Sequence, residues 1–431
     1  MQEIHIPQVV LENLPSRLQS QRPRIAYLLS QYPAISHTFF LKEILGLKQL
    51  GFQVETASIN GPDRPIDLLP DSEKLEARSA YYIKTLGVGK ILRIMALLLL
   101  RETRVCLRGL DAARRLVRWD IRDGLYALFY LGEALLLGEW MQRRGLHHLH
   151  THFGGPVATV GMLAARAWGF SYSLTIHGPE EFYDVEQFYL PQKIQHASFI
   201  FCISNFCRSQ LMKCSHPSQW DKFHVLRLGV DPQEFAPVAS GPQDTIRIVS
   251  VGRLVPAKGQ LILLQAFHKL LDQGRNIQLV FVGNGPDKEH LQQFVDEKDL
   301  GQHVIFCGAL NHDQTRQQLE QAHIFVLASF AEGVPIALME AMAMEIPCVS
   351  TSIAGIPELI RHNVDGLLVP ASSVEGLASA VDQLVTNEEL RRRLGSSARE
   401  RVIDRYNLPR NLQLLATAFD ECLSQRTALE I

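Results

Sequence analysis

Short apolar runs alternate with segments of helical spacing through the first half of the chain. RIAYLLS (24–30) has the composition of a buried strand, a helix is expected over about 38–50, and FQVETASI (52–59) suits the next strand. The alternation resumes with HLHTHF, a helix over 156–168, SYSLTIHG and FIFCISN. Parallel sheets with crossover helices give this pattern, so we predict a doubly wound α/β domain with a helical insertion over 84–146.

A second series of the same kind begins at IRIVSVGRLVPAKG and continues through IQLVFVGNGPD, HVIFCG, HIFVLAS, PCVST and GLLVP. We therefore predict an α/β protein with two facing Rossmann-like domains and an interdomain cleft, where such folds bind ligands. The predicted parts are an N-terminal extension (1–23), a first domain (24–236), a second domain (237–407) and a C-terminal helix (408–431) that crosses back to the first domain. The boundary lies in GVDPQEFAPVASGPQD because Pro, Gly and polar residues suit a linker.

The composition narrows the class of protein. The 431 residues carry a formal net charge of −2, which argues against a general nucleic-acid binder. The 7 cysteines contain no Cys-x-x-Cys pair, which favours buried thiols over a disulfide framework or a zinc site. The longest oily runs are shorter than the roughly 20 residues that span a bilayer, and the first residues lack signal-peptide features. We expect a cytoplasmic protein.

Two carboxylates stand in the otherwise apolar stretch SFAEGVPIALMEAMAMEIP. Pro335 suits the first position of a helix, whose free backbone amides form a ready phosphate site. Glu332 precedes that start and Glu340 follows it, and ionised carboxylates accept hydrogen bonds from hydroxyl groups. A ligand with a phosphate centre and hydroxyl-rich groups on both sides is a nucleotide sugar. The residues predicted to contact this ligand are Glu332, Gly333, the amides of Ile336, Ala337 and Leu338, and Glu340. The alternative is that the two glutamates are solvated acids on the protein surface.

The diphosphate of such a ligand needs positive charge. Asp-x-Asp, a common metal-binding tripeptide of sugar transferases, is absent from the sequence, so we expect neither a metal nor another cofactor. VGRLVPAKG instead supplies Arg253 and Lys258 on a loop after a buried strand. Arg can bind two phosphate oxygens and Lys acts as a point charge. Gly283, in VGNGPD, is a weaker candidate for the same ligand, because a tight turn before a helix needs the same glycines.

Histidines gather in the first domain. His177 ends a strand in LTIHGPEEFYD and can position a sugar hydroxyl; a hydrogen-bonded core histidine is the alternative. LHHLHTHFGG offers further histidines, of which His150 and His152 are expected on one strand face. No carboxylate or cysteine near them in the sequence completes a metal-ligand set, so no metal site is predicted.

The run EGVPIALMEAMAMEIPCVSTSIAGIPELIRHNVDGLLVP, together with VGRLVPAKG, resembles family 4 of the retaining glycosyltransferases. The resemblance implies the two-domain GT-B fold, metal-independent transfer from a nucleotide-diphosphate sugar, and a Glu-x7-Glu motif that Glu332 and Glu340 match. It also implies diphosphate contacts from Arg253 and Lys258. SQYPAISHTFFLKEI, HTHFGG, TIHGPEEF and LGVDPQEF resemble the branch that builds bacterial exopolysaccharides such as colanic acid.

We therefore expect a hexosyltransferase whose acceptor is a glycan or a lipid-linked saccharide, with His177, Glu332, Arg253 and Lys258 as the catalytic group. The alternatives are a non-catalytic nucleotide- or glycan-binding relative, or a phosphorylase or nucleotide-sugar epimerase of the same fold. Residues 84–124 hold ten Lys or Arg against four acids, interleaved with apolar residues. Such a segment either docks on an anionic membrane surface or packs on its own domain.

Overall fold

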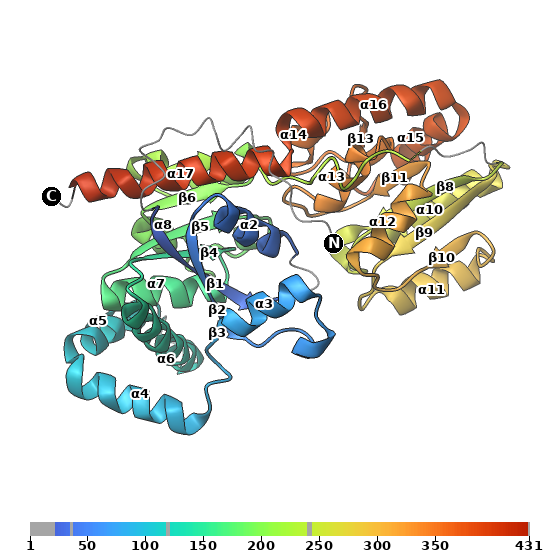
Figure 1. The fold of residues 1–431 in the computed structure, drawn as a ribbon. Coiled ribbons are helices and arrows are strands. Elements are labelled where there is room, and N and C mark those ends of the chain that lie inside the picture. Colours follow the sequence, from blue (N-terminus) through green and yellow to red (C-terminus); the bar gives the residue numbers. More distant parts are fainter. Residues whose placement is uncertain (1–21, 35–37, 118–120, 239–243, 430–431) are drawn as a thin grey trace. The chain divides into compact units, whose positions relative to one another are not determined.

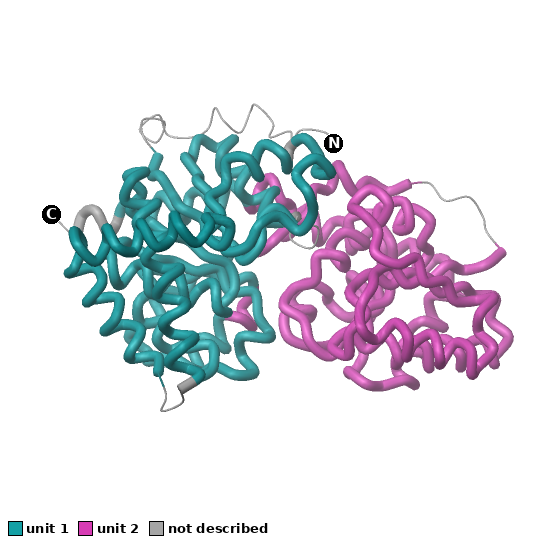
Figure 2. The backbone as a smooth tube through the Cα atoms, turned by 90° about the horizontal axis from the view of Figure 1, so that it is seen from below, with its two compact units in different colours: residues 1–203, 208–226, 412–431 teal, residues 204–207, 227–411 magenta. Residues whose placement is uncertain are grey.

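The computed structural model describes residues 22–34, 38–117, 121–238 and 244–429. Contacts divide the chain into unit 1, with residues 1–203, 208–226 and 412–431, and unit 2, with residues 204–207 and 227–411 (Figures 1 and 2). Residues 1–21, most of the predicted N-terminal extension, lie outside the described residues.

Unit 1 is built on a seven-stranded parallel sheet in the order β3-β2-β1-β4-β5-β6-β7. Its strands are β1 (Arg24–Gln31), β2 (Gln53–Asn60), β3 (Tyr81–Tyr82), β4 (His148–His152), β5 (Ser171–Ile176), β6 (Phe199–Cys202) and β7 (Phe223–Val225). Its helices are α2 (Thr38–Gln49), α3 (Asp71–Ser79), α4 (Val88–Arg101), α5 (Thr103–Arg114), α6 (Ile121–Arg144), α7 (Pro156–Trp168), α8 (Leu190–His196), most of α9 (Asn205–Lys213) and most of α17 (Leu408–Leu429).

Strand β4 is buried on both faces. On one face, Leu149 and Thr151 approach Gly161 of α7 so closely that a Cβ there would lie 2.9 Å from a Thr151 methyl carbon. On the other face, the rings of His148 and His150 contact Phe419 of α17. Helices α7 and α17 thus cover opposite faces of the sheet, and Figure 1 shows α17 running along it.

The predicted insertion between β3 and β4 consists of α4, α5 and α6. Helices α5 and α6 both pack on α7, whereas α4 packs on α5 and α6. Within the described residues, no helix is both long enough and apolar enough to span a membrane.

Unit 2 holds a six-stranded parallel sheet in the order β10-β9-β8-β11-β12-β13. Its strands are β8 (Ile246–Val251), β9 (Ile277–Val282), β10 (Val304–Phe306), β11 (Ile324–Leu327), β12 (Cys348–Thr351) and β13 (Leu367–Val369). Its helices are α10 (Gln260–Asp272), α11 (Lys288–Glu297), α12 (His312–Glu320), α13 (Ile336–Ala343), α14 (Ile356–Leu359), α15 (Val374–Thr386) and α16 (Glu388–Arg405).

The structure divides the chain after Leu226, earlier than the predicted 236/237 boundary. The reason is that the segment after Leu226 bonds to unit 2: Val230 N donates to Tyr406 O at 2.9 Å, and the Arg399 guanidinium donates to Phe235 O at 3.2 Å. A Pro- and Gly-rich composition therefore did not mark the point at which the contacts change.

Candidate functional site

The topological switch point of unit 2 lies between β8 and β11. From β8 the sheet continues through β9 and β10, and from β11 it continues through β12 and β13. Loops that leave neighbouring strands toward opposite sides open a crevice at the carboxyl ends, where open α/β sheets bind ligands. The two loops here are 252–259, after β8, and 328–335, after β11.

The two loops are held together by their backbones. Phe330 N donates to Ala257 O at 2.8 Å, and a short 3-10 helix (Pro256–Lys258) ends the first loop. Gly259 follows with φ +61°, and a Cβ there would lie 2.2 Å from Ala328 O. Only glycine fits this approach, so Gly259 brings Lys258 to the second loop.

Lys258 and Glu332 form an ion pair across the switch point. The Lys258 ammonium donates to Glu332 Oε1 at 2.5 Å, and the Ser329 hydroxyl donates to the same oxygen at 2.7 Å. Glu332 is 6% exposed, as its apolar neighbours predicted, and Ser329 is fully buried. Sequence reasoning gave Lys258 and Glu332 separate roles and overlooked Ser329, which stands three residues before the carboxylate in SFAE.

Helix α13 begins one residue later than predicted. Pro335 is its N-cap, with extended backbone (ψ 124°), and Ile336 is the first helical residue. The prediction that Pro335 is the first helical residue was wrong because its backbone is extended; as the N-cap, it accepts the first helical hydrogen bond, from Met339 N at 3.3 Å. The amides of Ile336, Ala337 and Leu338 precede that bond and are the donors that a helix cannot satisfy internally. Glu340, in the second turn, is half-buried.

Glycines set how closely the neighbouring loops pack. Gly283 has φ +144°, and a Cβ there would lie 1.9 Å from Gly252 O. Leu254 N donates to Asn284 O at 3.0 Å, so the turn after β9 supports the loop that carries Arg253. Arg253 itself is exposed. The contacts give Gly283 a packing role, and its predicted role in ligand binding stays a prediction.

The loop after β12 contacts the loop after β11 and leads into α14 (Ile356–Leu359). Gly355 N donates to Gly333 O at 3.1 Å, which braces the residue beside Glu332. Glu358 accepts from the backbone amides of Asn205 at 3.0 Å and Phe206 at 2.7 Å. Its carboxylate therefore caps the start of α9, where the helix dipole favours negative charge.

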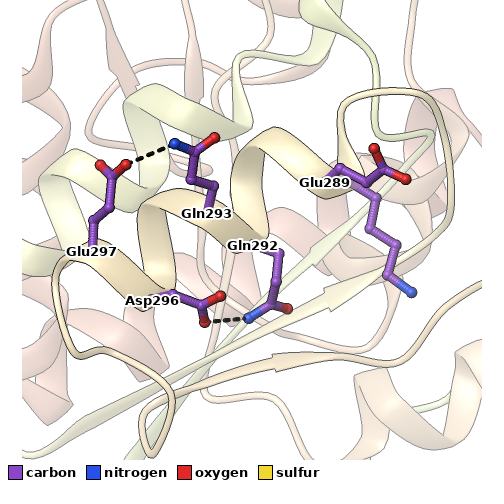
Figure 3. A pocket seen from close by; sticks show the side chains of 6 residues that line it. Glu289, Gln292, Gln293, Asp296 and Glu297 are labelled. Atoms are coloured by element: carbon purple, nitrogen blue, oxygen red, sulfur yellow. Dashed lines mark hydrogen bonds between the residues drawn. The ribbon is translucent and has the colours of Figure 1, made fainter.

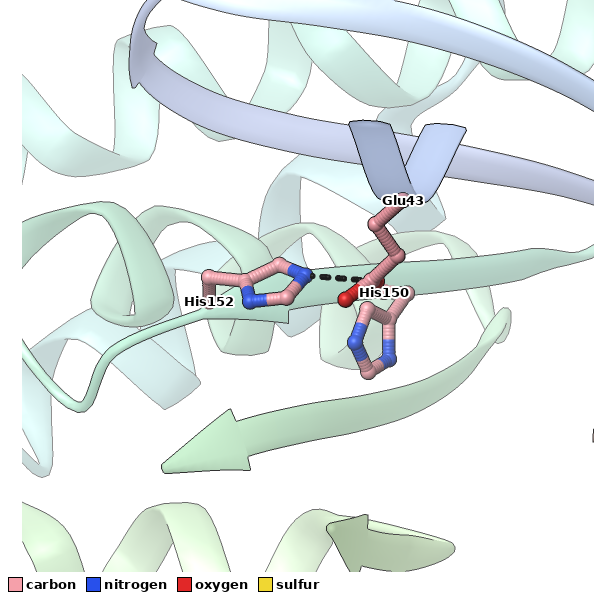
Figure 4. Close-up of side chains that lie close together, drawn as sticks. All are labelled: Glu43, His150 and His152. Atoms are coloured by element: carbon pink, nitrogen blue, oxygen red, sulfur yellow. Dashed lines mark hydrogen bonds and ion pairs between the residues drawn. The ribbon is translucent and has the colours of Figure 1, made fainter. Parts of the chain in front are cut away.

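In unit 1, His177 follows β5 and joins a buried polar chain. Its Nε2 lies 3.0 Å from His152 Nδ1, and His152 Nε2 lies 3.0 Å from Glu43 Oε1. Figure 4 shows Glu43 reaching from α2 toward the His150 and His152 side chains. Sequence reasoning found no carboxylate for these histidines; that was wrong, because α2 brings Glu43 to them.

The ligand atoms of Glu43, His150 and His152 lie within 4.8 Å of one another, a spacing that suits a metal ion. Both ring nitrogens of His150, however, already lie at hydrogen-bonding distance from hydroxyls: Ser173 Oγ at 2.7 Å and Thr175 Oγ1 at 3.0 Å. Burial, with smaller contributions from the neighbouring histidines, holds the pKa of His150 well below its ordinary value. The arrangement is that of a neutral, hydrogen-bonded imidazole.

A buried lysine supports the loop after β4. Lys193 Nζ donates to Gly154 O at 2.6 Å, Gly155 O at 2.9 Å and Phe188 O at 2.6 Å. Burial lowers the pKa of Lys193 to about 7, and the nearby Glu181 carboxylate opposes that shift. Glu181 Oε1 accepts from Gly154 N at 3.0 Å. The sequence gave no signal for this support, because its partners are backbone carbonyls.

A shallow hollow on α11 lies in unit 2 (Figure 3). Its lining comes from one helix, and its side chains pair with each other: Gln292 donates to Asp296 at 2.9 Å, and Gln293 donates to Glu297 at 2.8 Å. These are ordinary contacts one helical turn apart. The hollow therefore adds nothing to the site at the switch point.

Comparison with protein families identifies the chain. Residues 98–234 match the model of Glycosyltransferase Family 4, and residues 233–401 match that of Glycosyl transferases group 1. Together the matches include β4 and β5 of unit 1 and both switch-point loops of unit 2. The chain belongs to the family 4 glycosyltransferases. It is therefore a glycosyl-transferring enzyme, as predicted.

Curated relatives of this glycosyltransferase include two from bacteria. WcaL of Escherichia coli, a glycosyltransferase named for colanic acid biosynthesis, is 26% identical over 389 residues, covering 85% of this chain and 92% of WcaL. The amylovoran biosynthesis glycosyltransferase AmsK of Erwinia amylovora is 25% identical over 382 residues, covering 85% and 91%. The predicted resemblance to the exopolysaccharide branch is confirmed.

Solved structures share the fold of this glycosyltransferase. Sucrose-phosphate synthase from Thermosynechococcus elongatus has a TM-score of 0.74 at 18% identity, covering 94% of this chain and all of that chain. HepE of Anabaena, in complex with UDP-glucose, has a TM-score of 0.69 at 15% identity, covering 93% and 100%. The predicted GT-B fold class is confirmed.

Proposed function

We propose that this enzyme moves a hexosyl group from a nucleoside diphosphate sugar to a glycan or lipid-linked saccharide, with retention at the anomeric carbon. The product would be a bacterial exopolysaccharide or another cell-surface polysaccharide. The observation that carries the proposal is the Lys258–Glu332 pair, whose carboxylate lies in the loop directly before the N-terminus of α13. The relatives named for colanic acid and amylovoran biosynthesis support the product class, and HepE, solved with UDP-glucose, supports the donor class.

The diphosphate belongs at Lys258, Arg253 and the first amides of α13. An ammonium carries three donors, so Lys258 can keep its bond to Glu332 and still donate to a phosphate oxygen. Arg253 is exposed and can swing onto the same group. Negative charge grows on the departing diphosphate, and fixed cations and amides that stabilise it lower the barrier. These groups supply the positive charge for which other transferases use a metal, so added chelator should leave turnover unchanged.

The two acids of the motif hold hydroxyl groups. Glu332 Oε1 is engaged by Lys258 and Ser329, which fixes the carboxylate plane while Glu332 contacts the transferred sugar. Glu340, one turn into α13, contacts the ribose. In unit 1, His177 positions a sugar hydroxyl.

Transfer with retention follows from attack on the face that the diphosphate leaves. The bond from the anomeric carbon to the phosphate oxygen breaks as the bond to the acceptor oxygen forms. The acceptor's proton passes to the departing phosphate oxygen. A front-face course is favoured because no carboxylate is assigned as a nucleophile. NMR of the product linkage tests this step, and an inverted anomer contradicts it.

A panel of nucleotide sugars provides the test of the reaction itself. Slow hydrolysis or transfer from one donor is the expected result. Turnover only with free phosphate and a glycan would show a phosphorylase, conversion of the nucleotide sugar to its epimer would show an epimerase, and binding without turnover would show a non-catalytic relative. Each of those outcomes rejects the proposed transfer.

Helices α4, α5 and α6 expose apolar and basic side chains that suit an anionic membrane surface. A lipid-linked acceptor would lie at such a surface. Among these helices, Leu100 is 80% exposed and Phe129 is 54% exposed. Exposed basic side chains lie among the apolar ones, for example Lys90, Arg93 and Arg104. Residues 118–120 of the segment lie outside the described residues. Single exposed apolar residues are ordinary, but a group of them mixed with cations suits the surface of an anionic membrane.

Flotation with liposomes tests the membrane contact. We expect binding to vesicles containing phosphatidylglycerol at low salt, and loss of that binding with neutral phosphatidylcholine. Replacing Leu99 and Leu100 by Ser should weaken binding, whereas Leu414→Ser, also exposed but on α17, should not. Absence of binding to the anionic vesicles would restrict the segment to packing on its own unit.

A further inference from the structure

A continuous hydrogen-bonded chain leads through the core of unit 1 to His177. The Tyr27 hydroxyl donates to Glu43 Oε1 at 2.8 Å, and that oxygen lies 3.0 Å from His152 Nε2. His152 Nδ1 in turn lies 3.0 Å from His177 Nε2. All four side chains are buried, with His177 at 6% exposure. The chain thus starts at β1 and α2, passes β4 and ends just after β5.

The direction of the hydrogen bonds follows from the ends of the chain. Burial raises the pKa of the Tyr27 hydroxyl well above its ordinary value, so it stays protonated and donates. An ionised carboxylate only accepts, so His152 must donate from Nε2. A neutral imidazole has one donor and one acceptor nitrogen. With a neutral His152 ring, Nδ1 accepts and His177 donates from Nε2.

Aromatic rings keep the two imidazoles in these orientations. The Phe153 ring centroid lies 4.5 Å from that of His177, and the Phe39 centroid lies 5.4 Å from it. Phe40 packs edge-on to His152 at 4.6 Å. Phe153 has φ +65°, an uncommon conformation for a residue other than glycine, which the surrounding fold must impose. Packing thus fixes the ring planes, and the hydrogen bonds fix the protons.

We propose that Glu43 and His152 are positioning residues for His177, and that they hold it as the tautomer protonated at Nε2, with Nδ1 as the hydrogen-bond acceptor. A sugar hydroxyl that meets His177 would then act as donor to the ring. This assignment rests on the proposed function in one respect, the use of His177 toward a sugar. The tautomer itself is independent of that function and can be measured without any donor.

Nitrogen NMR of the full-length chain labelled with ¹⁵N-histidine tests the assignment. Two-bond proton–nitrogen correlations distinguish a protonated ring nitrogen from a bare one, and His177→Gln identifies the His177 signals by their loss. We expect Nε2 protonated and Nδ1 bare in the wild type. In Glu43→Leu that preference should be lost, and in Glu43→Gln, whose amide oxygen can still accept, it should be kept at least in part.

A matched control separates this role from a general loss of packing. Glu76 is also a buried carboxylate in unit 1 and accepts from a tyrosine, Tyr32, at 3.1 Å. It is not part of the hydrogen-bonded series from Tyr27 to His177. Glu76→Leu should lower stability and leave the His177 signals unchanged. The proposal is overturned if wild-type His177 is protonated at Nδ1, if Glu43→Leu leaves its tautomer unchanged, or if Glu76→Leu alters it equally.

Activity provides the second readout once a donor is known. Glu43→Leu and His152→Phe should each lower kcat about tenfold or more, in the range of one positioned acid–base or polar contact. The KM for the donor should stay unchanged, because the nucleotide contacts lie in unit 2. If these variants lose activity but keep the tautomer preference of His177, the positioning role is contradicted. If they alter the tautomer but the wild-type enzyme transfers no sugar from any donor, only the proposed function is contradicted.

Discussion

At the scale of single residues, the ion pair between Lys258 and Glu332 dominates the candidate site. A carboxylate 6% exposed to solvent has lost most of its hydration, and the loss is compensated only if donors surround it. Lys258 and Ser329 are those donors. The same contacts leave the ammonium partly exposed, with 24% of its side-chain surface accessible. Lys258 can therefore serve Glu332 and an incoming anion together.

Removing either member of this pair should cost most of the activity. Hydrogen bonds to charged groups contribute about 1.5–3 kcal/mol, so Lys258→Ala and Glu332→Ala should each lower kcat/KM on the order of 10- to 100-fold. Lys298→Ala, an exposed lysine of the same unit, is the matched control. Steady-state rates with the active donor and circular dichroism for folding are the measurements. Wild-type turnover in either variant would remove the pair from the site.

His150 should make the stability of unit 1 depend on pH. Its folded pKa is depressed by burial, so the stability it contributes is present above the unfolded value near 6.5 and is lost as pH falls below that. The free energy of unfolding should fall by at most about 1.4 kcal/mol per pH unit from this group. His196, whose pKa burial lowers to about 4, contributes in the same direction.

Urea unfolding at pH 7.5 and pH 5.5 measures this effect. His150→Gln should show a smaller difference between the two pH values than the wild type. His303→Gln, an exposed histidine, should show the wild-type difference. An equal pH dependence in His150→Gln and the wild type would contradict a neutral His150 in the folded state.

At the scale of elements, backbone contacts between loops set the geometry of the site. The loops after β8, β9, β11 and β12 touch through main-chain bonds and glycines, as in the pair Gly355 N and Gly333 O. After the end of α13, Glu345 also has a positive φ, +61°. Gly283 and Gly355 thus lie where two of these loops come within contact distance.

Gly283 offers the clearest test of this packing. Gly283→Ala places a methyl group 1.9 Å from Gly252 O and forces alanine into φ +144°. We expect unit 2 to lose about 2–4 kcal/mol, the range for a strained backbone combined with overpacking. Gly301→Ala is the control, because a Cβ there meets nothing within 4 Å. Calorimetry should show a lower melting temperature for Gly283→Ala alone, and equal values in both variants would contradict the packing role.

At the scale of the whole molecule, segments far apart in sequence complete each unit. Residues 412–431 belong to unit 1, where Phe419 packs on Phe201 with ring centroids 5.0 Å apart. Residues 204–207 belong to unit 2, where Glu358 binds the amides at the start of α9. Neither unit is thus a single continuous stretch of chain.

Phe419 should be necessary for unit 1. It is fully buried against the face of the sheet that carries His148 and His150, so Phe419→Ala should cost about 3–5 kcal/mol. All 4 tryptophans lie within the ranges of unit 1, so their fluorescence reports the unfolding of that unit specifically. Leu414→Ala, on the exposed side of α17, is the control. If Phe419→Ala unfolds at the wild-type midpoint when followed by tryptophan fluorescence, α17 is not part of the folding unit.

Much of the fold, and the two carboxylates of the motif in the candidate site, could be predicted from local patterns. Buried strands, crossover helices and the motif with Glu332 and Glu340 are visible because their periodicity and spacing are local in the sequence. Ser329 and the structural role of Glu358 were not visible, because their partners come from other loops. Glu43 was not visible either, since it stands 109 positions from His152 along the chain.

The sequence by itself determined that this protein is a two-domain α/β transferase with two carboxylates on either side of the start of an apolar helix, because strand composition, helix starts and motif spacing are properties of neighbouring residues. Only the tertiary structure decided that Lys258 is paired with Glu332, that a carboxylate reaches the histidines, and where the chain divides. Those features depend on which side chains meet across loops and sheets, and the free energy of burying a charge or a polar ring depends on every group around it.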